Sequence, residues 1–484
     1  MRKQNWRKRK YRTCDLTLST PFLLSIFAEI FFMNFHFIAI GGSAMHNLAL
    51  ALHAGGDVIT GSDDAIYEPS RSRLLKHNLL PNEMGWFPEK INPALDGIIL
   101  GMHAREDNPE LLKARELGLK IYSYPEFLFK HSQNKTRVVI GGSHGKTTIT
   151  SMILHVMKYH GKEIDFMVGA QIEGYDNMVH LTRENDFILL EGDEYLSSPI
   201  DRRPKFHLYR PNIALLSGIA WDHINVFPTF DNYVDQFRIF IETITTGGIL
   251  VYNAEDPVLS SLVDEATNPI RKQAYLTHEY RVENDLTVID TPEGDLQIDL
   301  LGSHNMNNLS GAKWVCQHMG IDEDDFYEAI ASFKGASKRL EVVVKTGRSI
   351  LYKDFAHSPS KVRATTRAVK EQFPDRKVFS FVELHTFSSL SPLFLEQYKG
   401  SLEYADEAAV FYSPEALQQK KMAPIEKEDI YNAFEKNNLQ VFTDPRAFKI
   451  YVESLNFDNS ALLFMSSGNY GGLNLDELGA LLTS

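Results

Sequence analysis

The chain has 484 residues, of which 43% are hydrophobic and 23% charged, and its formal net charge is -13. This length and composition allow about two to four globular domains and exclude a disordered chain. An acidic surface repels phosphate backbones, so we expect no nucleic-acid partner. The two cysteines, Cys14 and Cys316, cannot build a disulfide framework or a cysteine-based zinc site, which fits a cytoplasmic protein.

The first 32 residues differ from the rest of the chain. Residues 2–12 contain seven Lys and Arg, and Pro21 to Phe32 is a mostly apolar run. This order resembles a signal peptide, but the run is too short to span a bilayer and no small-residue cleavage site follows it. We therefore expect Met33 to be the native start, residues 1–32 to be an extension outside the folded protein, and no stable membrane insertion.

Residues 33–134 predict a Rossmann-like nucleotide-binding domain. Phe35–Ile40 is strand-like, the turn Gly41–Ser43 follows, and a helical stretch comes next. The second strand, residues 58–63, ends in Asp63, about 20 residues after the turn, where a Rossmann unit places its ribose contact. Further strands are expected at 98–101 and 120–122. The turn lacks the full G-x-G-x-x-G pattern and also fits a turn used only for packing.

Residues 135–335 predict a second α/β domain that opens with a phosphate-binding loop. A strand at 137–140 precedes Gly142-Ser143-His144-Gly145-Lys146-Thr147-Thr148, and a helix-like stretch follows at 149–158. Backbone amides and a helix N-terminus can hold phosphates, Lys146 adds a positive charge, and the Thr147 hydroxyl can bind Mg²⁺. The strict pattern has Gly where this chain has Ile140, so a turn that binds nothing is the alternative.

Two further strand ends in this domain carry candidate metal ligands. The strand at 187–190 ends in Glu191-Gly192-Asp193-Glu194, and Trp221-Asp222-His223 follows the strand at 213–216. A carboxylate beside a phosphate loop can hold Mg²⁺, and Glu191 is the best candidate; a solvated acidic turn is the alternative. His223 could bind a metal or position a phosphate, although a lone His is more often structural.

The same alternation of strands and helices continues to the C-terminus. The sequence predicts strands at 249–252, and then at 350–353, 378–382, 408–411 and 462–465 in a third domain, residues 336–484. Strands that alternate with helices predict mainly parallel sheets with helices on both faces.

Together these motifs resemble the Mur ligase family of peptidoglycan synthesis. The loop Gly142–Thr148 is similar to the family's phosphate loop, with Ser143 in place of Thr, and the D-H pair is similar to Asp222-His223. The family's H-N-x-x-N signature resembles His304-Asn305-Met306-Asn307-Asn308. The resemblance implies an α/β protein of three domains: a Rossmann-like UDP-binding domain, a P-loop ATPase, and a Rossmann-like domain that binds the amine substrate.

The resemblance also implies an ATP- and Mg²⁺-dependent ligase that forms an amide bond through an acyl phosphate on UDP-N-acetylmuramate. It gives catalytic roles to Lys146, Glu191 and His223, and metal binding to Thr147, Glu191 and His223. The implied ATP-binding residues are Gly142, Ser143, His144, Gly145, Lys146, Thr147, Thr148, Asn305, Asn308, Arg339, Asp354 and His357. The implied UDP-sugar residues are Gly41, Gly42, Ser43, His46, Asp63 and Arg71. Ordinary packing is an equal alternative for Asp354 and His357, and Asp63 could simply cap the next turn.

The identity of the amine acceptor depends on finer resemblances. Arg238 stands where several family members carry a carbamylated lysine, and a guanidinium cannot form a carbamate, which favours the two branches acting directly on UDP-N-acetylmuramate. One branch adds L-alanine, and the other adds the recycled tripeptide L-alanyl-γ-D-glutamyl-meso-diaminopimelate. Residues 194–195, 201–206, 209–211, 354–357 and 465–472 resemble the recycling branch.

We therefore expect the tripeptide as acceptor, with L-alanine as the alternative. Leu196 and Ser358 depart from the recycling pattern, and residues 383–388 fit neither branch. Arg363 and Arg367 could grip a peptide carboxylate or form a solvated helix face. A folylpolyglutamate synthetase is disfavoured by the first domain, and a catalytically silent, nucleotide-gated binding protein is disfavoured by the intact motifs. The sequence leaves the oligomeric state open.

Overall fold

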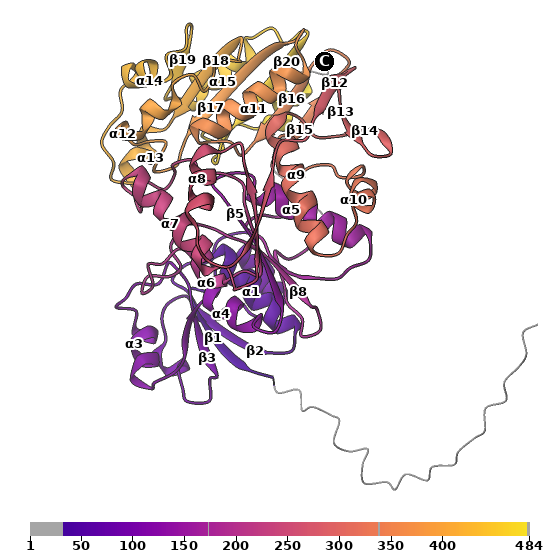
Figure 1. Ribbon diagram of the computed structural model, residues 1–484. Coiled ribbons are helices and arrows are strands. Elements are labelled where there is room, and N and C mark those ends of the chain that lie inside the picture. Colours follow the sequence, from indigo (N-terminus) through magenta and orange to yellow (C-terminus); the bar gives the residue numbers. More distant parts are fainter. Residues whose placement is uncertain (1–31, 173, 337–338, 482–484) are drawn as a thin grey trace, which may run out of the picture.

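The computed structural model describes residues 32–172, 174–336 and 339–481, and it arranges them as three α/β units one after another (Figure 1). We call these the N-terminal unit (elements within 34–131), the central unit (136–330) and the C-terminal unit (341–481). Each unit is built on a mainly parallel sheet with helices, so the predicted three-domain α/β fold is confirmed. The expected extension, residues 1–32, lies outside the described residues except for Phe32, which is exposed.

The N-terminal unit is a four-stranded parallel sheet in the order β2-β1-β3-β4. Its strands are β1 (Asn34–Ile38), β2 (Val58–Ser62), β3 (Gly97–Leu100) and β4 (Ile121–Ser123). Its helices are α1 (Ser43–Ala54), α2 (Ser70–Lys76), η1 (Pro88–Lys90), α3 (Pro109–Glu116) and α4 (Tyr124–His131). The start of α4 is fixed by a capping box between Ser123 and Glu126. All four predicted strands are confirmed.

The central unit is a seven-stranded sheet in the order β11-β10-β9-β5-β8-β6-β7, parallel except for β7. Its strands are β5 (Thr136–Gly141), β6 (Asp165–Met167), β7 (Val179–His180), β8 (Phe187–Glu191), β9 (Ile213–Leu216), β10 (Ile249–Asn253) and β11 (Arg271–Tyr275). Its helices are α5 (Lys146–Tyr159), α6 (Lys205–Tyr209), α7 (Phe230–Thr243), α8 (Pro257–Glu265), α9 (Ser303–His318) and α10 (Glu323–Ile330).

The order of the central strands positions the candidate site. Strand β5 lies between β8 and β9, and all three are parallel and almost fully buried. Their carboxyl ends therefore meet at one edge of the sheet, where ligands bind in open α/β sheets. This brings the loops after residues 141, 191 and 216 together.

A small antiparallel sheet follows β11, and the sequence did not predict it. Its strands are β12 (Tyr280–Glu283), β13 (Leu286–Thr291) and β14 (Gly294–Ile298). Asn284 and Asp285 join β12 to β13, both with positive φ (52° and 60°). A type I′ hairpin turn needs positive φ at both central residues, and Asn and Asp tolerate it well.

The C-terminal unit is a six-stranded sheet in the order β15-β16-β20-β17-β18-β19, parallel except for β15. Its strands are β15 (Glu341–Lys345), β16 (Ile350–Asp354), β17 (Lys377–Leu384), β18 (Glu407–Tyr412), β19 (Gln440–Phe442) and β20 (Ser460–Met465). Its helices are α11 (Pro359–Gln372), α12 (Pro392–Leu395), η2 (Glu396–Tyr398), α13 (Pro414–Gln419), α14 (Lys427–Phe434), α15 (Pro445–Glu453) and α16 (Leu475–Leu481).

The N-terminal and central units share one hydrophobic core. A continuous cluster of buried side chains runs from Phe37 and Leu128 of the N-terminal unit to Val139, Leu190 and Phe206 of the central unit. The C-terminal unit has separate core clusters around Val382 and Phe381. Within the described part of the chain, no helix is both long enough and apolar enough to cross a lipid bilayer.

Candidate functional site

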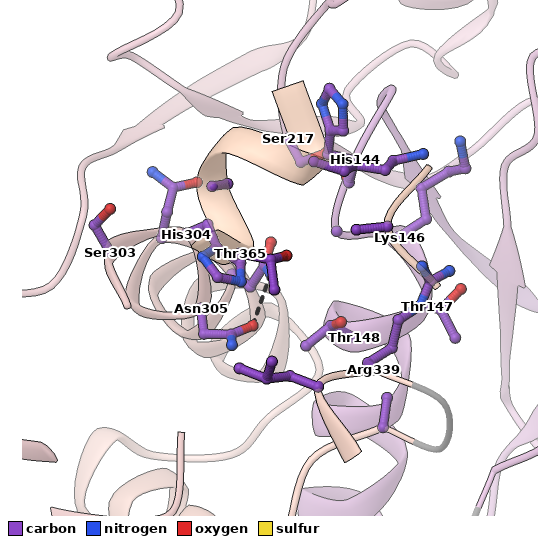
Figure 2. A pocket seen from close by; sticks show the side chains of 18 of the residues that line it. His144, Lys146, Thr147, Thr148, Ser217, Ser303, His304, Asn305, Arg339 and Thr365 are labelled. Atoms are coloured by element: carbon purple, nitrogen blue, oxygen red, sulfur yellow. Dashed lines mark hydrogen bonds between the residues drawn. The ribbon is translucent and has the colours of Figure 1, made fainter. Parts of the chain in front are cut away.

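A cavity of about 450 Å³ lies between the central and C-terminal units. The loop 143–148 and the start of α9 line it from the central unit, and residues 354–365 line it from the C-terminal unit. Figure 2 shows His144, Lys146 and Thr147 on one side and Ser303, His304 and Asn305 on the other. The cavity therefore joins segments that lie far apart in the sequence.

Two glycines let the loop approach its neighbours closely. Gly142 has φ 122°, and a Cβ there would lie 2.2 Å from the Ser217 Oγ. Gly145 has φ 74°, and its Cβ would lie 2.1 Å from Oδ1 of Asn308. Ile140 is buried within β5, so the glycine of the strict pattern is replaced by a strand residue. Helix α5 begins at Lys146, directly after Gly145.

Lys146 is held by an ion pair inside the central unit. Its Nζ donates to Glu194 Oε2 at 2.6 Å and to the carbonyl of Gly142 at 2.7 Å. Burial lowers the pKa of Lys146, but the negative charges of Glu194 and Asp193 outweigh burial and the net shift is upward. Lys146 is therefore a permanent positive charge beside the loop.

The predicted metal ligands divide into two adjacent groups. The Thr147 hydroxyl donates to Glu191 Oε1 at 2.9 Å, and Glu191 Oε2 accepts from the amide of Gly169 at 2.8 Å. His223 lies instead beside Glu194, with Nε2 and Oε1 3.7 Å apart. Hydroxyl and carboxylate oxygens are ligands that Mg²⁺ prefers, so Thr147 and Glu191 fit this ion.

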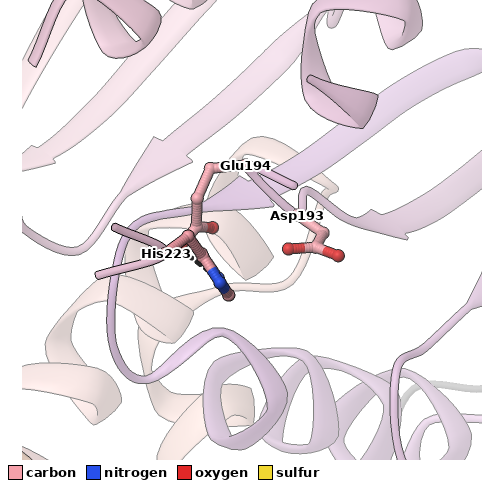
Figure 3. A group of neighbouring side chains, drawn as sticks. All are labelled: Asp193, Glu194 and His223. Carbon is pink, nitrogen blue, oxygen red and sulfur yellow. Dashed lines mark ion pairs between the residues drawn. The ribbon is translucent and has the colours of Figure 1, made fainter. Parts of the chain in front are cut away.

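The second group contains two acids that the sequence analysis did not select. Asp193, Glu194 and His223 present ligand atoms within 4.8 Å of one another (Figure 3). Burial acts to raise the pKa of Asp193, but the positive charges of Lys205 and Lys146 outweigh burial, so the net shift of the pKa is downward and the carboxyl stays ionised. The acidic run after β8 was the available signal, but the sequence could not show which acids turn inward.

Helix α9 lines the cavity with three asparagines. Asn305 Nδ2 donates to the carbonyl of Leu301 at 2.9 Å. Asn308 lies against Gly145 of the loop and its Nδ2 is 3.4 Å from Asn305 Oδ1. Asn307, which was not predicted, donates to Asn253 Oδ1 at 3.2 Å. The H-N-x-x-N signature therefore contacts the phosphate loop through Asn308 and lines the cavity through Asn305 and Asn307 as well.

Arg339, just before β15, and Asp354 of the C-terminal unit line the cavity, whereas His357 is not among the lining residues. The guanidinium of Arg339 lies 5.1 Å from the centre of the Phe355 ring. Asp354 accepts from the Thr365 hydroxyl at 2.8 Å. Burial lowers the pKa of His357 to about 4, so its ring is neutral at physiological pH.

A second cavity, of about 380 Å³, lies between the N-terminal and central units. Ser43 and Asn47 of α1 line it together with Lys146, Glu191 and Lys205. The turn after β1 thus opens toward the phosphate loop from the other side. The Lys205 ammonium, from α6, donates to Asp193 Oδ2 at 2.5 Å.

The other predicted UDP-sugar residues have structural contacts. Asp63 is buried and accepts from the amide of Gly41 at 2.7 Å, which closes the turn. His46 is also buried, with Nδ1 2.9 Å from the carbonyl of Gly42. Arg71 is exposed.

Arg73 and not Arg71 turns toward the central unit. Its Nη1 donates to Asn47 Oδ1 at 2.8 Å and its Nη2 donates to the carbonyl of Asp176. Residues two apart on a helix face different directions, so only one of the two arginines could face inward. The family resemblance predicts Arg71 as the sugar contact, and no signal in the sequence distinguishes it from Arg73.

Three further arginines lie in surface ion pairs. Arg238 Nη1 pairs with Glu265 at 2.6 Å. Arg363 pairs with Glu403 at 2.5 Å, and Arg367 pairs with Glu371 at 2.5 Å. These contacts favour the solvated-face alternative for Arg363 and Arg367.

Comparison with known proteins identifies the family. Residues 34–136 match the Mur ligase family catalytic domain, and residues 140–316 match the Mur ligase middle domain. The UDP-N-acetylmuramate–L-alanine ligase of Caldicellulosiruptor saccharolyticus is 30% identical over 417 residues, covering 83% of this chain and 88% of that protein. The chain belongs to the Mur ligase family.

Two further relatives cover almost the whole chain. The UDP-N-acetylmuramate–L-alanyl-γ-D-glutamyl-meso-2,6-diaminoheptandioate ligase of Haemophilus influenzae is 27% identical over 462 residues, covering 92% of this chain and 99% of that protein. The crystal structure of a murein peptide ligase from Psychrobacter arcticus covers 93% of this Mur ligase and 98% of that chain, with a TM-score of 0.63 and 23% identity. As a Mur ligase, the protein is an ATP- and Mg²⁺-dependent enzyme that forms C–N bonds.

Proposed function

We propose that this Mur ligase joins UDP-N-acetylmuramate to the tripeptide L-alanyl-γ-D-glutamyl-meso-diaminopimelate, in peptidoglycan recycling. The observation that carries the proposal is the end-to-end match to the Haemophilus influenzae ligase, which includes the C-terminal unit. The stretch 201–206 supports it, because its Lys205 lines the cavity between the N-terminal and central units.

The reaction would proceed in two balanced steps. A carboxylate oxygen of the sugar attacks the γ-phosphorus of ATP, the bond to the β-phosphate oxygen breaks, and ADP leaves. The amine of the peptide then attacks the carbonyl carbon of the acyl phosphate, the C–O bond to phosphate breaks, and the amine loses a proton. The products are an amide, ADP and inorganic phosphate.

We assign the phosphates of ATP to the loop 142–148, with Lys146 as the charge that offsets negative charge on the transferred group. Mg²⁺, which Thr147 and Glu191 would hold with His223 nearby, supplies further positive charge to the phosphates. Asn305, Asn308 and Arg339 would contact the nucleotide. Asp354 would border the site, with His357 behind the lining.

We assign UDP-N-acetylmuramate to the second cavity. The turn Gly41–Ser43 would hold the pyrophosphate at the start of α1. Asp63 and His46 would act by holding this turn in shape. Because Lys146 and Glu191 line both cavities, the sugar carboxylate would meet the γ-phosphate between them.

An acceptor screen tests the proposal. Purified protein with ATP, Mg²⁺ and UDP-N-acetylmuramate is given L-alanine, the dipeptide L-alanyl-γ-D-glutamate or the tripeptide, and phosphate release and product mass are measured. We expect the tripeptide to exceed L-alanine in kcat/KM by about 100-fold or more, because a site built for polar substrate groups discriminates strongly against analogues that lack them.

L-alanine is the second candidate, because the Caldicellulosiruptor saccharolyticus relative has the slightly higher identity. A preference for L-alanine would replace the tripeptide proposal with this one. If no acceptor gives phosphate release, the result would favour a nucleotide-binding protein without ligase activity.

A further inference from the structure

Helix α11 brings a lysine to the nucleotide cavity that no motif singled out. Lys361 lies in the first turn of the helix, is partly buried, and lines the same cavity as Lys146. The preceding residue, Ser360, places its Oγ 2.8 Å from Nε2 of His144 in the phosphate loop. The first turn of α11 therefore lies directly against the loop.

The ammonium of Lys361 has no partner in the protein. Across residues 32–172, 174–336 and 339–481, no hydrogen bond or ion pair involves its Nζ, whereas Lys146 is paired with Glu194 at 2.6 Å. Burial lowers the pKa of Lys361; Lys146 and Arg339 lower it further, while Asp222 and Glu194 act in the opposite direction. The net shift of the pKa is downward, so Asp222 and Glu194 do not offset the combined effect of burial and the two neighbouring cations.

The acids that line the cavity already have donors of their own. Glu191 accepts from Thr147, Glu255 accepts from Thr277, and Asp354 accepts from Thr365. Each of these carboxylates is therefore satisfied locally.

Two of the lining cations are left without a carboxylate. Arg339 has a ring contact with Phe355 and, in the described part of the chain, no ion pair. A partly buried cation without a counter-ion is unfavourable until an anion binds. Lys361 and Arg339 together fit a ligand with several negative charges.

We propose that Lys361 is a further catalytic residue, which contacts the terminal phosphoryl group of ATP from the C-terminal unit while Lys146 contacts it from the central unit. Positive charge on both sides would offset the charge that develops on the transferred group. The inference rests on the ATP-dependent ligase chemistry and is independent of which acceptor is used.

The test compares Lys361→Met with Lys370→Met in the full chain. Lys370 lies on the same helix but pairs with Asp406 at the surface, so it controls for loss of a lysine from α11. Binding of ADP and of a non-hydrolysable ATP analogue, both with Mg²⁺ and without sugar or acceptor, is measured by titration calorimetry. The values of kcat and of KM for each substrate are then measured with the acceptor that the wild-type enzyme uses.

We expect Lys361→Met to weaken the ATP analogue about tenfold while ADP binding changes little, because only the analogue carries a γ-phosphate. The kcat/KM for ATP should fall about 100-fold. Lys361→Arg should restore part of the affinity for the analogue and part of the kcat/KM for ATP. The melting temperature of Lys361→Met without ligands should not fall, since Lys361 has no partner to lose.

Three results would overturn the inference. They are unchanged analogue binding, equal weakening of ADP and the analogue, and a change confined to the KM of the acceptor, which would place Lys361 at the acceptor carboxylate. Failure of the tripeptide proposal would be seen in the wild-type acceptor screen alone, so the two failures are distinguishable.

Discussion

At the scale of single residues, Glu194 links the phosphate loop to the rest of the site. One oxygen pairs with Lys146 and the other accepts from the Tyr233 hydroxyl at 2.9 Å. The Tyr233 oxygen also lies 2.8 Å from the Ser143 hydroxyl. A phosphate bound to the loop must compete with Glu194 for the lysine, and Tyr233 and His223 would then help to hold the released carboxylate.

The negative charge of Glu191 can be tested by a single substitution. Glu191→Gln keeps the shape and an oxygen that can accept from Thr147, but it removes the negative charge. We expect the Mg²⁺ concentration for half-maximal phosphate release to rise about 10- to 100-fold. Glu163→Gln, an exposed acid of the same unit, serves as the control. Equal Mg²⁺ dependence in the two variants would show that Glu191 does not bind the metal.

At the scale of elements, most buried strands could be predicted, whereas most of the short or half-exposed strands could not. Strands β5, β8 and β9 are continuous hydrophobic runs, because parallel strands are buried on both faces. Strand β7 has two residues, and the edge strand β15 is mostly exposed or partly buried, so neither carries a strong pattern. The hairpin of β12 and β13 had a turn signal in Asn284-Asp285, but weak flanking strands.

The close approach of the loop before α5 to helix α9 can be tested at Gly145, with Gly161 for comparison. Gly145→Ala and Gly161→Ala both place a side chain at positive φ, 74° and 64°, which costs about 1–2 kcal/mol each. Only at Gly145 would the new methyl collide with Asn308, since nothing lies within 4 Å at Gly161. Urea unfolding and nucleotide titration are the measurements.

We expect both variants to lose stability, and only Gly145→Ala to bind the ATP analogue at least about tenfold more weakly. Wild-type affinity in Gly145→Ala would mean that the close approach of loop and α9 is dispensable for nucleotide binding.

At the scale of the whole molecule, the phosphate loop was predictable from its own spacing, whereas its partners from other segments were predicted only by the family resemblance or were missed. The residues from Gly142 to Thr148 are contiguous, so the motif is visible in the sequence. Lys205 and Lys361 line the candidate cavities, and Arg73 contacts the central unit, only because the fold brings distant segments together, and residues so far apart carry no shared pattern.

The contact between the N-terminal and central units can be tested at Arg73, with Arg71 for comparison. Arg73→Met removes the hydrogen bonds that tie Asn47 of α1 to Asp176 of the central unit. We expect the KM for UDP-N-acetylmuramate to rise about tenfold, which corresponds to about one hydrogen bond from a charged group, with ATP analogue binding nearly unchanged.

Arg71→Met is measured in parallel, because the family resemblance pointed to that residue. A rise in the sugar KM in Arg71→Met alone would restore Arg71 as the contact and contradict the role of Arg73.

The core shared by the N-terminal and central units restricts how this enzyme can be recombined with its relatives. A chimera joined near residue 134 would need matching apolar surfaces on both sides of the junction, since Phe37 and Val139 belong to one cluster. A junction between Phe333 and Glu341 separates the central unit from a unit with core clusters of its own. The C-terminal unit is therefore the part that evolution, or an engineer, can exchange with the least repacking.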